Sequence, residues 1–368
     1  MRPLALTVAL LSMAVAAHAA QAPSLQQTRL TAGDGAAGDN FGVSVALDGD
    51  TALAGSYADD VGTNVNQGSV YVFTRAGGVW TQQARLIAND GAAGDFFGFS
   101  VALSGDTALV GAYQNDVGTN ADQGAAYVFT RVGGVWTEQQ KLTAADGGVN
   151  DFFGDSVALS GDTALVGADG HDVNGNQLQG AVYVFTRVVS RPRSPHRATG
   201  IWTLQQTLTA SDGAGGDSFG VSVALEGDTA LVGADADDVG TNVNQGSVYV
   251  FTRVSGGWNE SAHLIAGDGG AGDLLGVSVS LSGNTAVVGA AGDDVGANLD
   301  QGSAYVFTET GGAWTEQAKL TASDGAASDF FGVSVALSGN TATLTTSALT
   351  AGTHNAGPPF QASMARRA

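Results

Sequence analysis

Loops rich in aspartate and asparagine recur along the 368-residue chain, and their oxygen atoms could bind a cation. One of them places Asp172, Asn174 and Asn176 at alternate positions, and carboxylate and amide oxygens are the ligands that Ca²⁺ prefers. The candidate calcium ligands are Asp59, Asp60, Asn64, Asn66, Asp116, Asn120, Asp122, Asp172, Asn174, Asn176, Asp237, Asp238, Asn242, Asp293, Asp294, Asn298 and Asp300. Asp and Asn also favour turns, because their side chains cap the backbone and tolerate left-handed conformations. Since no loop completes a D-x-D-x-D-G pattern, both interpretations stay open, and calcium is the only cofactor that the sequence suggests.

A second set of acidic residues comes in pairs, such as Asp90 and Asp95. Paired carboxylates perform acid–base chemistry when their environments separate their pKa values. Equivalent pairs in a repeated unit have equivalent environments, so we expect these residues to cap turns. The first member of the pair recurs at Asp34, Asp90, Asp146, Asp212, Asp268 and Asp324.

A serine in a Gly-x-Ser-x-Ala context resembles the nucleophile elbow of hydrolases, which needs a helix directly after the serine. Here the serine recurs inside an expected strand, at Ser44, Ser100, Ser156, Ser222, Ser278 and Ser334. The histidines occupy non-equivalent places, and we expect His171, in an acidic loop, to be solvated. The sequence therefore indicates no catalytic residue and favours a protein that is not an enzyme.

The overall charge excludes several kinds of partner. The net charge is −21 and the pI is about 4.2, which argues against nucleic acid and against an anionic membrane surface. The chain has no cysteine, so neither disulfides nor thiolate metal sites are available. Stability must come from a buried core, and a chain of this length can form one.

The residues discussed so far belong to a unit that recurs at a spacing of 56 residues, as from Leu86 to Leu142. The interval from Leu142 to Leu208 is 66 residues because 188–200 is a Pro- and Arg-containing insertion, which we expect to be an exposed loop. The predicted repeats are 33–86, 89–142, 145–208, 211–264, 267–320 and a partial unit at 323–346.

Each unit predicts four short strands because its apolar residues alternate with a period of two. In the second unit these are Phe99–Leu103, Thr107–Gly111, Ala125–Thr130 and Trp136–Leu142. Small residues dominate the early strands and aromatic residues the later ones, which is typical of a wedge-shaped propeller blade.

We therefore expect an all-β fold, a β-propeller of four-stranded antiparallel blades at 22–346. Five blades would be complete. The incomplete sixth would be closed by an N-terminal strand, because Gln26–Ala32 matches the text of a fourth strand.

Two glycine motifs in each unit resemble the FG-GAP repeat family of bacterial exported proteins and, more distantly, the propeller of integrin α-chains. The first motif is found at Asn40–Phe41–Gly42, Phe97–Gly98, Phe153–Gly154, Phe219–Gly220 and Phe331–Gly332, with Leu275–Gly276 as a variant. The second is found at Gly55–Ser56, Gly111–Ala112, Gly167–Ala168, Gly233–Ala234 and Gly289–Ala290. The resemblance covers about 22–342 and implies a propeller used for binding or adhesion.

The chain departs from the integrin pattern in two places. Integrin-type repeats hold calcium between the two glycine motifs, where this chain has only a turn such as Ser104–Asp106, so that site is not carried over. From Gly339 onward the text resembles a short piece of bacterial Ig-like repeats, and we expect an irregular tail at 347–368.

The N-terminus has the pattern of a secretory signal peptide at 1–19, with Arg2, an apolar run and a small-x-small site before cleavage. No cysteine follows for a lipid anchor, and no later stretch has transmembrane length. We expect an exported protein that is periplasmic, cell-surface or extracellular and is not inserted in the membrane after cleavage.

These observations predict an exported, non-enzymatic binding or adhesion scaffold that presents propeller loops to a protein or glycan partner. One alternative is an extracellular hydrolase or lyase at the propeller mouth, which would need a polar cluster that breaks the repeat. Only His171 and the insertion 188–200 break it noticeably. Another alternative is a truncated fragment of a larger surface protein.

Overall fold

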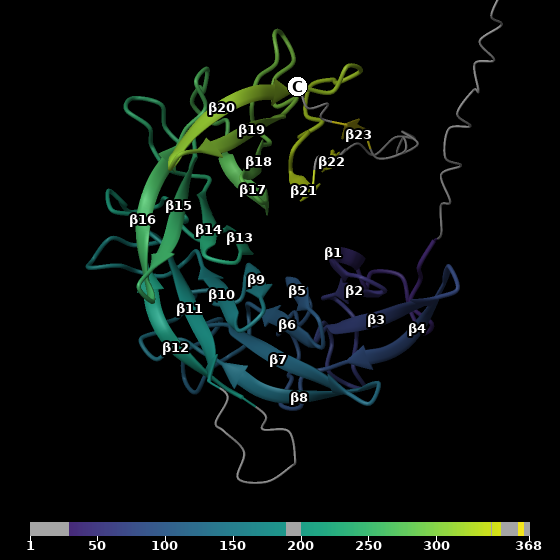
Figure 1. Ribbon diagram of the computed structural model, residues 1–368. Helices are drawn as coiled ribbons and strands as arrows, with labels where there is room; N and C mark the ends of the chain where they lie inside the picture. Colours follow the sequence, from purple (N-terminus) through teal and green to yellow (C-terminus); the bar gives the residue numbers. More distant parts are fainter. Residues whose placement is uncertain (1–28, 189–199, 340, 347–359, 364–368) are drawn as a thin grey trace, which may run out of the picture. The chain divides into compact units, whose positions relative to one another are not determined.

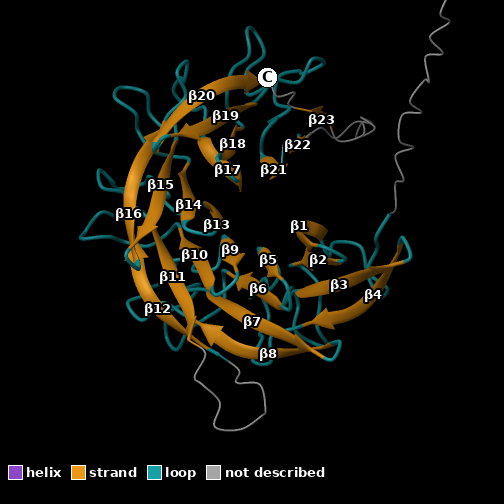
Figure 2. Ribbon diagram, in the orientation of Figure 1, coloured by secondary structure: helices purple, strands orange, loops and turns teal. Residues whose placement is uncertain are grey.

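The fold consists of strands and loops, and its described part contains no helix (Figure 2). The computed structural model describes residues 29–188, 200–339, 341–346 and 360–363. Contacts divide the chain into Met1–Leu30 and Thr31–Ala368, and every strand belongs to the second unit. Within the described ranges no helix has the length and apolarity of a membrane span. The expected signal peptide, 1–19, lies outside the described residues.

Five sheets contain four antiparallel strands each, in the order of the chain. In the first blade these are β1 (Phe41–Asp48), β2 (Thr51–Ser56), β3 (Ser69–Ala76) and β4 (Val79–Leu86). The following blades are β5 (Val101–Ser104), β6 (Thr107–Ala112), β7 (Ala125–Val132) and β8 (Val135–Leu142); β9 (Val157–Ser160), β10 (Thr163–Ala168), β11 (Ala181–Val188) and β12 (Ile201–Leu208); β13 (Ser222–Glu226), β14 (Thr229–Ala234), β15 (Ser247–Val254) and β16 (Gly257–Leu264); and β17 (Leu275–Ser282), β18 (Thr285–Ala290), β19 (Ser303–Thr310) and β20 (Ala313–Leu320). The predicted β-propeller with five complete blades is confirmed.

The first strand of each blade is the innermost and the fourth is the outermost (Figure 1). Each innermost strand packs on that of the next blade, in the order β1, β5, β9, β13, β17. One strand is shorter than expected, since β5 begins at Val101 and not at Phe99. Gly98 has a φ of +93°, and the Phe99 N–H bonds back to the Phe96 carbonyl in a turn, so the extended conformation starts later.

The sixth sheet is incomplete, as predicted, and contains β21 (Ser334–Ser338) and β22 (Thr341–Thr345). A short strand, β23 (Phe360–Ser363), pairs with β22. The expected closing strand lies outside the described residues except for 29–32, which form no strand. The rest of the expected irregular tail, 347–359 and 364–368, is likewise outside them. So are residues 189–199 of the insertion, at whose ends Val188 pairs with Ile201.

Neighbouring blades touch through a pair of glycines. A Cβ placed on Gly111 would lie 1.9 Å from the carbonyl oxygen of Gly154 in the next blade. The Ser100 hydroxyl donates a hydrogen bond to the same carbonyl at 2.7 Å. The same contact joins Gly55 to Gly98, Gly167 to Gly220, Gly233 to Gly276 and Gly289 to Gly332. The two glycine motifs of the sequence are therefore the two sides of one contact between blades.

The sixth blade supplies Gly332 to the contact with the fifth blade but has no glycine at the second motif. Thr345 stands at the position of the paired glycines, and its carbonyl accepts the Gly332 N–H at 3.0 Å as theirs do. A Cβ at this position would obstruct the close approach that the other blades make. At the other end of the series, Val45 and Leu47 of β1 are 71% and 67% exposed. The first blade therefore leaves apolar side chains of β1 exposed to solvent, and the last blade has a threonine where the others have the contact glycine.

The hydrophobic core lies between consecutive blades and not inside any one of them. Phe97 of the second blade is fully buried and packs edge-on against Tyr127 and Phe129, with ring centroids 5.5 and 5.9 Å apart. The same cluster includes Leu53 and Val70 of the first blade. A single sheet cannot bury both of its faces, so each blade depends on its neighbours for a core.

We expect Gly111→Ala to lower the free energy of unfolding by about 3 kcal/mol, because the added methyl group meets a backbone oxygen that cannot rotate away. Chemical denaturation monitored by circular dichroism measures the loss. Gly257→Ala is the matched control, since its Cβ would have no atom closer than 3.9 Å. That control should change stability by less than about 0.5 kcal/mol. Equal effects of the two changes would contradict the role of the glycine contact.

Candidate functional site

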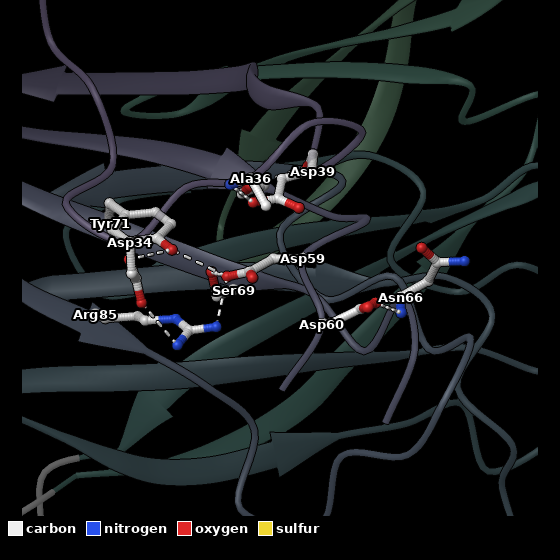
Figure 3. Close-up of polar contacts among 10 residues, drawn as sticks. Asp34, Ala36, Asp39, Asp59, Asp60, Asn66, Ser69, Tyr71 and Arg85 are labelled. Carbon is white, nitrogen blue, oxygen red and sulfur yellow. Dashed lines mark hydrogen bonds and ion pairs between the residues drawn. The ribbon is translucent and has the colours of Figure 1, made fainter. Parts of the chain in front are cut away.

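The acidic loop of the first blade lies between β2 and β3 and is held by side-chain contacts (Figure 3). The Asp59 carboxylate accepts hydrogen bonds from Ser69 Oγ and, at 3.0 Å, from Tyr71 OH. The Arg85 guanidinium, from β4, lies 2.6 Å from the same carboxylate and 3.0 Å from Asp34. A side-chain cation therefore occupies the place where the loop composition suggests a metal ion.

The fourth-strand position of Arg85 supplies a cation in most blades. Lys319 Nζ lies 2.8 Å from Asp268 and 2.7 Å from Asp293, whose side chain is 5% exposed. His263 lies 3.5 Å from Asp237. Burial lowers the pKa of His263, but the hydrogen bond to Asp237 and the nearby carboxylates together outweigh it, and the pKa is raised. The residues at this position are Arg85, Lys141, Thr207, His263 and Lys319.

In the third blade the cation comes from the loop instead of the strand. Thr207 carries no charge, and His171 replaces the first loop aspartate, with Nδ1 2.7 Å from Asp151. The expectation that His171 is solvated is wrong, because its side chain is only 13% exposed. The hydrogen bond to Asp151 raises the pKa of His171. In the second blade Asn115 takes this position and donates to Asp95 at 2.8 Å.

The other candidate calcium ligands shape their loops through the backbone. Asp60 accepts a hydrogen bond from the Asn66 N–H at 2.8 Å. The equivalent acceptors are Asp116, Asp172, Asp238 and Asp294. Residues with a positive φ in these loops include Asn66, Asp122, Asn174, Asn244 and Asp300.

The asparagine inside each loop links it to the next blade. Asn64 Nδ2 donates to Gln67 at 2.8 Å and to the Gly91 carbonyl at 3.0 Å. The equivalent donors are Asn120, Asn176, Asn242 and Asn298. In the described ranges no group of three or more His, Cys, Asp or Glu side chains is arranged to hold a metal ion. Calcium binding stays a prediction for these loops, in which carboxylates such as Asp59 and Asp60 already accept hydrogen bonds from the protein.

The second aspartate of each pair caps a turn, as predicted, whereas in the complete blades the first binds a tyrosine hydroxyl instead. Asp95 accepts the Ala92 N–H at 2.8 Å, and Asp90 accepts the Tyr127 hydroxyl at 2.9 Å. The same cap is formed by Asp39, Asp151, Asp217, Asp273 and Asp329. The repeated serines are likewise structural, since their hydroxyls bind the glycine carbonyl of the next blade.

Three partly buried aspartates break the repeat near the innermost strands. Asp155 stands where the other units have valine or phenylalanine, just before β9. Asp169 and Asp235 follow β10 and β14, where the first two blades have Tyr57 and Tyr113. Burial, together with repulsion from neighbouring carboxylates, raises the pKa of Asp155 and of Asp169. Burial also raises the pKa of Asp235 to about 6.

In the first two blades, aromatic side chains stand at positions that these aspartates occupy in the third and fourth. The ring centroids of Phe99 and Tyr113 are 4.4 Å apart, and those of Tyr57 and Phe96 are 5.3 Å apart. Since strands in a blade alternate in direction, the end of a second strand and the start of a first strand lie at the same end of the propeller. We name these residues the aromatic–acidic row: Tyr57, Phe96, Phe99, Tyr113, Phe152, Asp155, Asp169 and Asp235.

The sequence interpretation missed the aromatic–acidic row because it searched for features that the units share. The signal was present in the residues that differ between equivalent positions. Val43, Phe99, Asp155, Val221, Val277 and Val333 are equivalent, and so are Tyr57, Tyr113, Asp169, Asp235 and Ala291. Only the structure places these two positions at one end of the propeller.

We expect Lys319→Met to lower the free energy of unfolding by about 2 kcal/mol, because it leaves the buried Asp293 carboxylate without its cation. Lys141→Met is the matched control. Its partner, Asp90, is 53% exposed, so that loss should stay below about 1 kcal/mol. Urea denaturation at neutral pH compares the two. A larger loss for the Lys141 variant would contradict this account.

His171→Asn should remove a pH-dependent part of the stability while keeping a hydrogen-bond donor like Asn115 of the second blade. A histidine whose pKa is raised in the fold contributes stability that is fully present below the unfolded value of 6.5. That contribution is lost as the pH rises through the folded value. The wild type should therefore exceed the variant in stability at pH 5, and the difference should shrink towards pH 9. Thermal unfolding at a series of pH values measures it, and a constant difference would refute it.

Comparisons with known proteins agree with the propeller architecture. The chain is similar to a solved structure described as a putative 6-phosphogluconolactonase from Bacteroides uniformis ATCC 8492, with a TM-score of 0.53 and 13% identity. That similarity covers 82% of this chain and 77% of the other and shows the fold alone. A search of curated proteins gave no match. The FG-GAP repeat family matches residues 25–73, 80–129, 136–185, 202–251, 258–307 and 314–357. These matches span well over half of the sequence, and the chain belongs to the FG-GAP repeat family.

Proposed function

We propose that this protein is an exported, non-enzymatic binding or adhesion scaffold that presents one end of its propeller to a protein or glycan partner. The observation that carries the proposal is the aromatic–acidic row, which combines partly exposed rings with carboxylates. The repeated polar groups elsewhere are engaged in contacts within and between blades, as Asp59 and Ser100 are. The aromatic–acidic row is a set of residues that differ between units and lie together at one end of the propeller.

Export is part of the proposal and is supported by the signal-peptide pattern at 1–19. Net charge supports it in a weaker way, because a charge of −21 keeps a protein dispersed outside the cell. The sequence from Gly339 resembles Ig-like repeats. This resemblance supports the alternative that the chain is a fragment of a larger surface protein.

A hydrolase or lyase at the propeller mouth is the second candidate, and one observation favours it. Asp155 and Asp169 are adjacent carboxyl groups with raised pKa values, and such pairs can divide acid and base roles. His171, the residue that the sequence suggested for this role, is engaged with Asp151 and packs edge-on against Tyr183. A binding role requires fewer assumptions, because rings and carboxylates suffice for it.

The test uses the protein expressed with its own N-terminus and recovered from the periplasm or medium of a bacterial host. We expect the recovered chain to begin near Ala20. It should bind saturably to at least one protein or glycan on immobilised arrays, and it should not cleave a panel of chromogenic glycosides and esters. Turnover that disappears in Asp155→Asn, without saturable binding, would replace the scaffold with the hydrolase. Retention in the cytoplasm would refute export.

A further inference from the structure

The aromatic side chains of the row form a continuous chain of ring contacts across three blades. Tyr57 lies edge-on to Phe96 and Phe99, with ring centroids 5.3 and 5.5 Å apart. Tyr113 contacts Phe96, Phe99 and Phe152 at 5.8, 4.4 and 5.9 Å. All five rings are partly exposed, whereas the repeated core aromatics are buried.

These rings are not required by the repeat. The position of Phe96 and Phe152 is Asn40 in the first blade, Ser218 in the fourth and Leu274 in the fifth, and it is again a phenylalanine, Phe330, in the incomplete sixth. All six residues have a positive φ, 54° at Phe96 and 57° at Phe152. Asparagine tolerates this conformation readily, but a bulky aromatic residue adopts it at a cost in free energy. The fold needs the left-handed backbone here and does not need a ring, so the rings point to a surface function.

The carboxylates continue the chain of rings. Asp155 is repeat-equivalent to Phe99, and its N–H bonds to the Phe152 carbonyl at 2.9 Å. Asp169 is repeat-equivalent to Tyr113, and its Oδ1 is fully buried without a hydrogen-bond partner in the described structure. The ion pairs of the described residues include none made by Asp155, Asp169 or Asp235. A buried carboxylate oxygen without a hydrogen-bond partner is costly, and a cation beside the same carboxylate would offset part of that cost.

The chemistry of the row selects an organic cation. Aromatic faces attract ammonium and guanidinium groups, and neighbouring carboxylates that repel each other gain when a cation lies between them. Rings supply no ligand for a metal ion, so the row suits an ammonium group on an alkyl stem better than Ca²⁺. The row extends from Tyr57 in the first blade to Asp235 in the fourth, which is too long for one small amine. An extended segment with several lysine side chains matches that extent.

We propose that the aromatic–acidic row binds lysine side chains of a basic segment of a protein partner. The alkyl stems would lie on the rings of Tyr57, Phe99 and Tyr113. The ammonium groups would donate hydrogen bonds to Asp155 and to the accessible part of the Asp169 carboxylate. This inference rests on the proposed binding function and specifies its ligand.

The test titrates the full mature protein with a labelled peptide, acetyl-(Gly-Lys)₃-amide, at a physiological salt concentration and measures fluorescence anisotropy. The same peptide with norleucine in place of lysine keeps the alkyl stem and removes the charge. We expect saturable binding of the lysine peptide alone. Asp169→Asn and Tyr113→Ala should each weaken it about five-fold or more. Tyr113→Phe, which keeps the ring, should bind within about two-fold of the wild type.

Asp162→Asn is the matched control, because it removes the same charge in the turn between β9 and β10, at the opposite end of the blade. It should change the dissociation constant by less than about two-fold. Equal weakening by the Asp162 and Asp169 variants would overturn the proposal, because binding would then follow net charge alone. Equal binding of the norleucine peptide would also overturn it. If the lysine peptide fails to bind but an arrayed glycan or protein binds, this inference falls and the scaffold function stands.

Discussion

The close approach of two glycines is the constraint on which the structure depends. At Gly111 and its equivalents the backbone of one blade lies so near the next that no side chain fits between them. This contact sets the spacing between sheets, and the spacing allows Phe97 and its equivalents to fill the space between blades. A serine hydroxyl then bonds to the glycine carbonyl and satisfies it. The most repeated residues of the chain therefore serve the interface between blades.

The acidic loops show how one structural requirement is met in different ways. In each blade, carboxylates lie close together at the loop between the second and third strands. In most blades a basic side chain forms an ion pair with them. Arg85, His263 and Lys319 approach from the fourth strand, while His171 approaches from the loop itself. Four of the blades carry the cation on the fourth strand, and the third blade carries it on the loop. Such pairs tie the outer strand of a blade to its loops, and they give the loops a reason for their acidity that requires no bound ion.

The same comparison separates structure from function. Residues that recur in every unit have contacts that explain them, such as the turn cap of Asp95. Residues of the aromatic–acidic row differ between units, and the repeat does not account for them. Phe96 and Phe152 even occupy a left-handed backbone position that suits asparagine better. In a repeat protein, departures from the repeat are where a binding surface can develop without disturbing the scaffold.

The sequence by itself determined the blades, their four strands and the structural role of the repeated aspartates and serines. It could do so because strand periodicity and turn chemistry are local, and because repetition averages out ambiguity in any single copy. Tertiary structure decided which cation pairs with which carboxylate, because Arg85 and Asp59 meet only when the fourth strand is folded against the loop. It also decided that His171 is paired and that Asp155 lies near Tyr113 of the preceding blade. Those contacts depend on how consecutive sheets stack, and stacking is set by the glycine contact rather than by any local pattern.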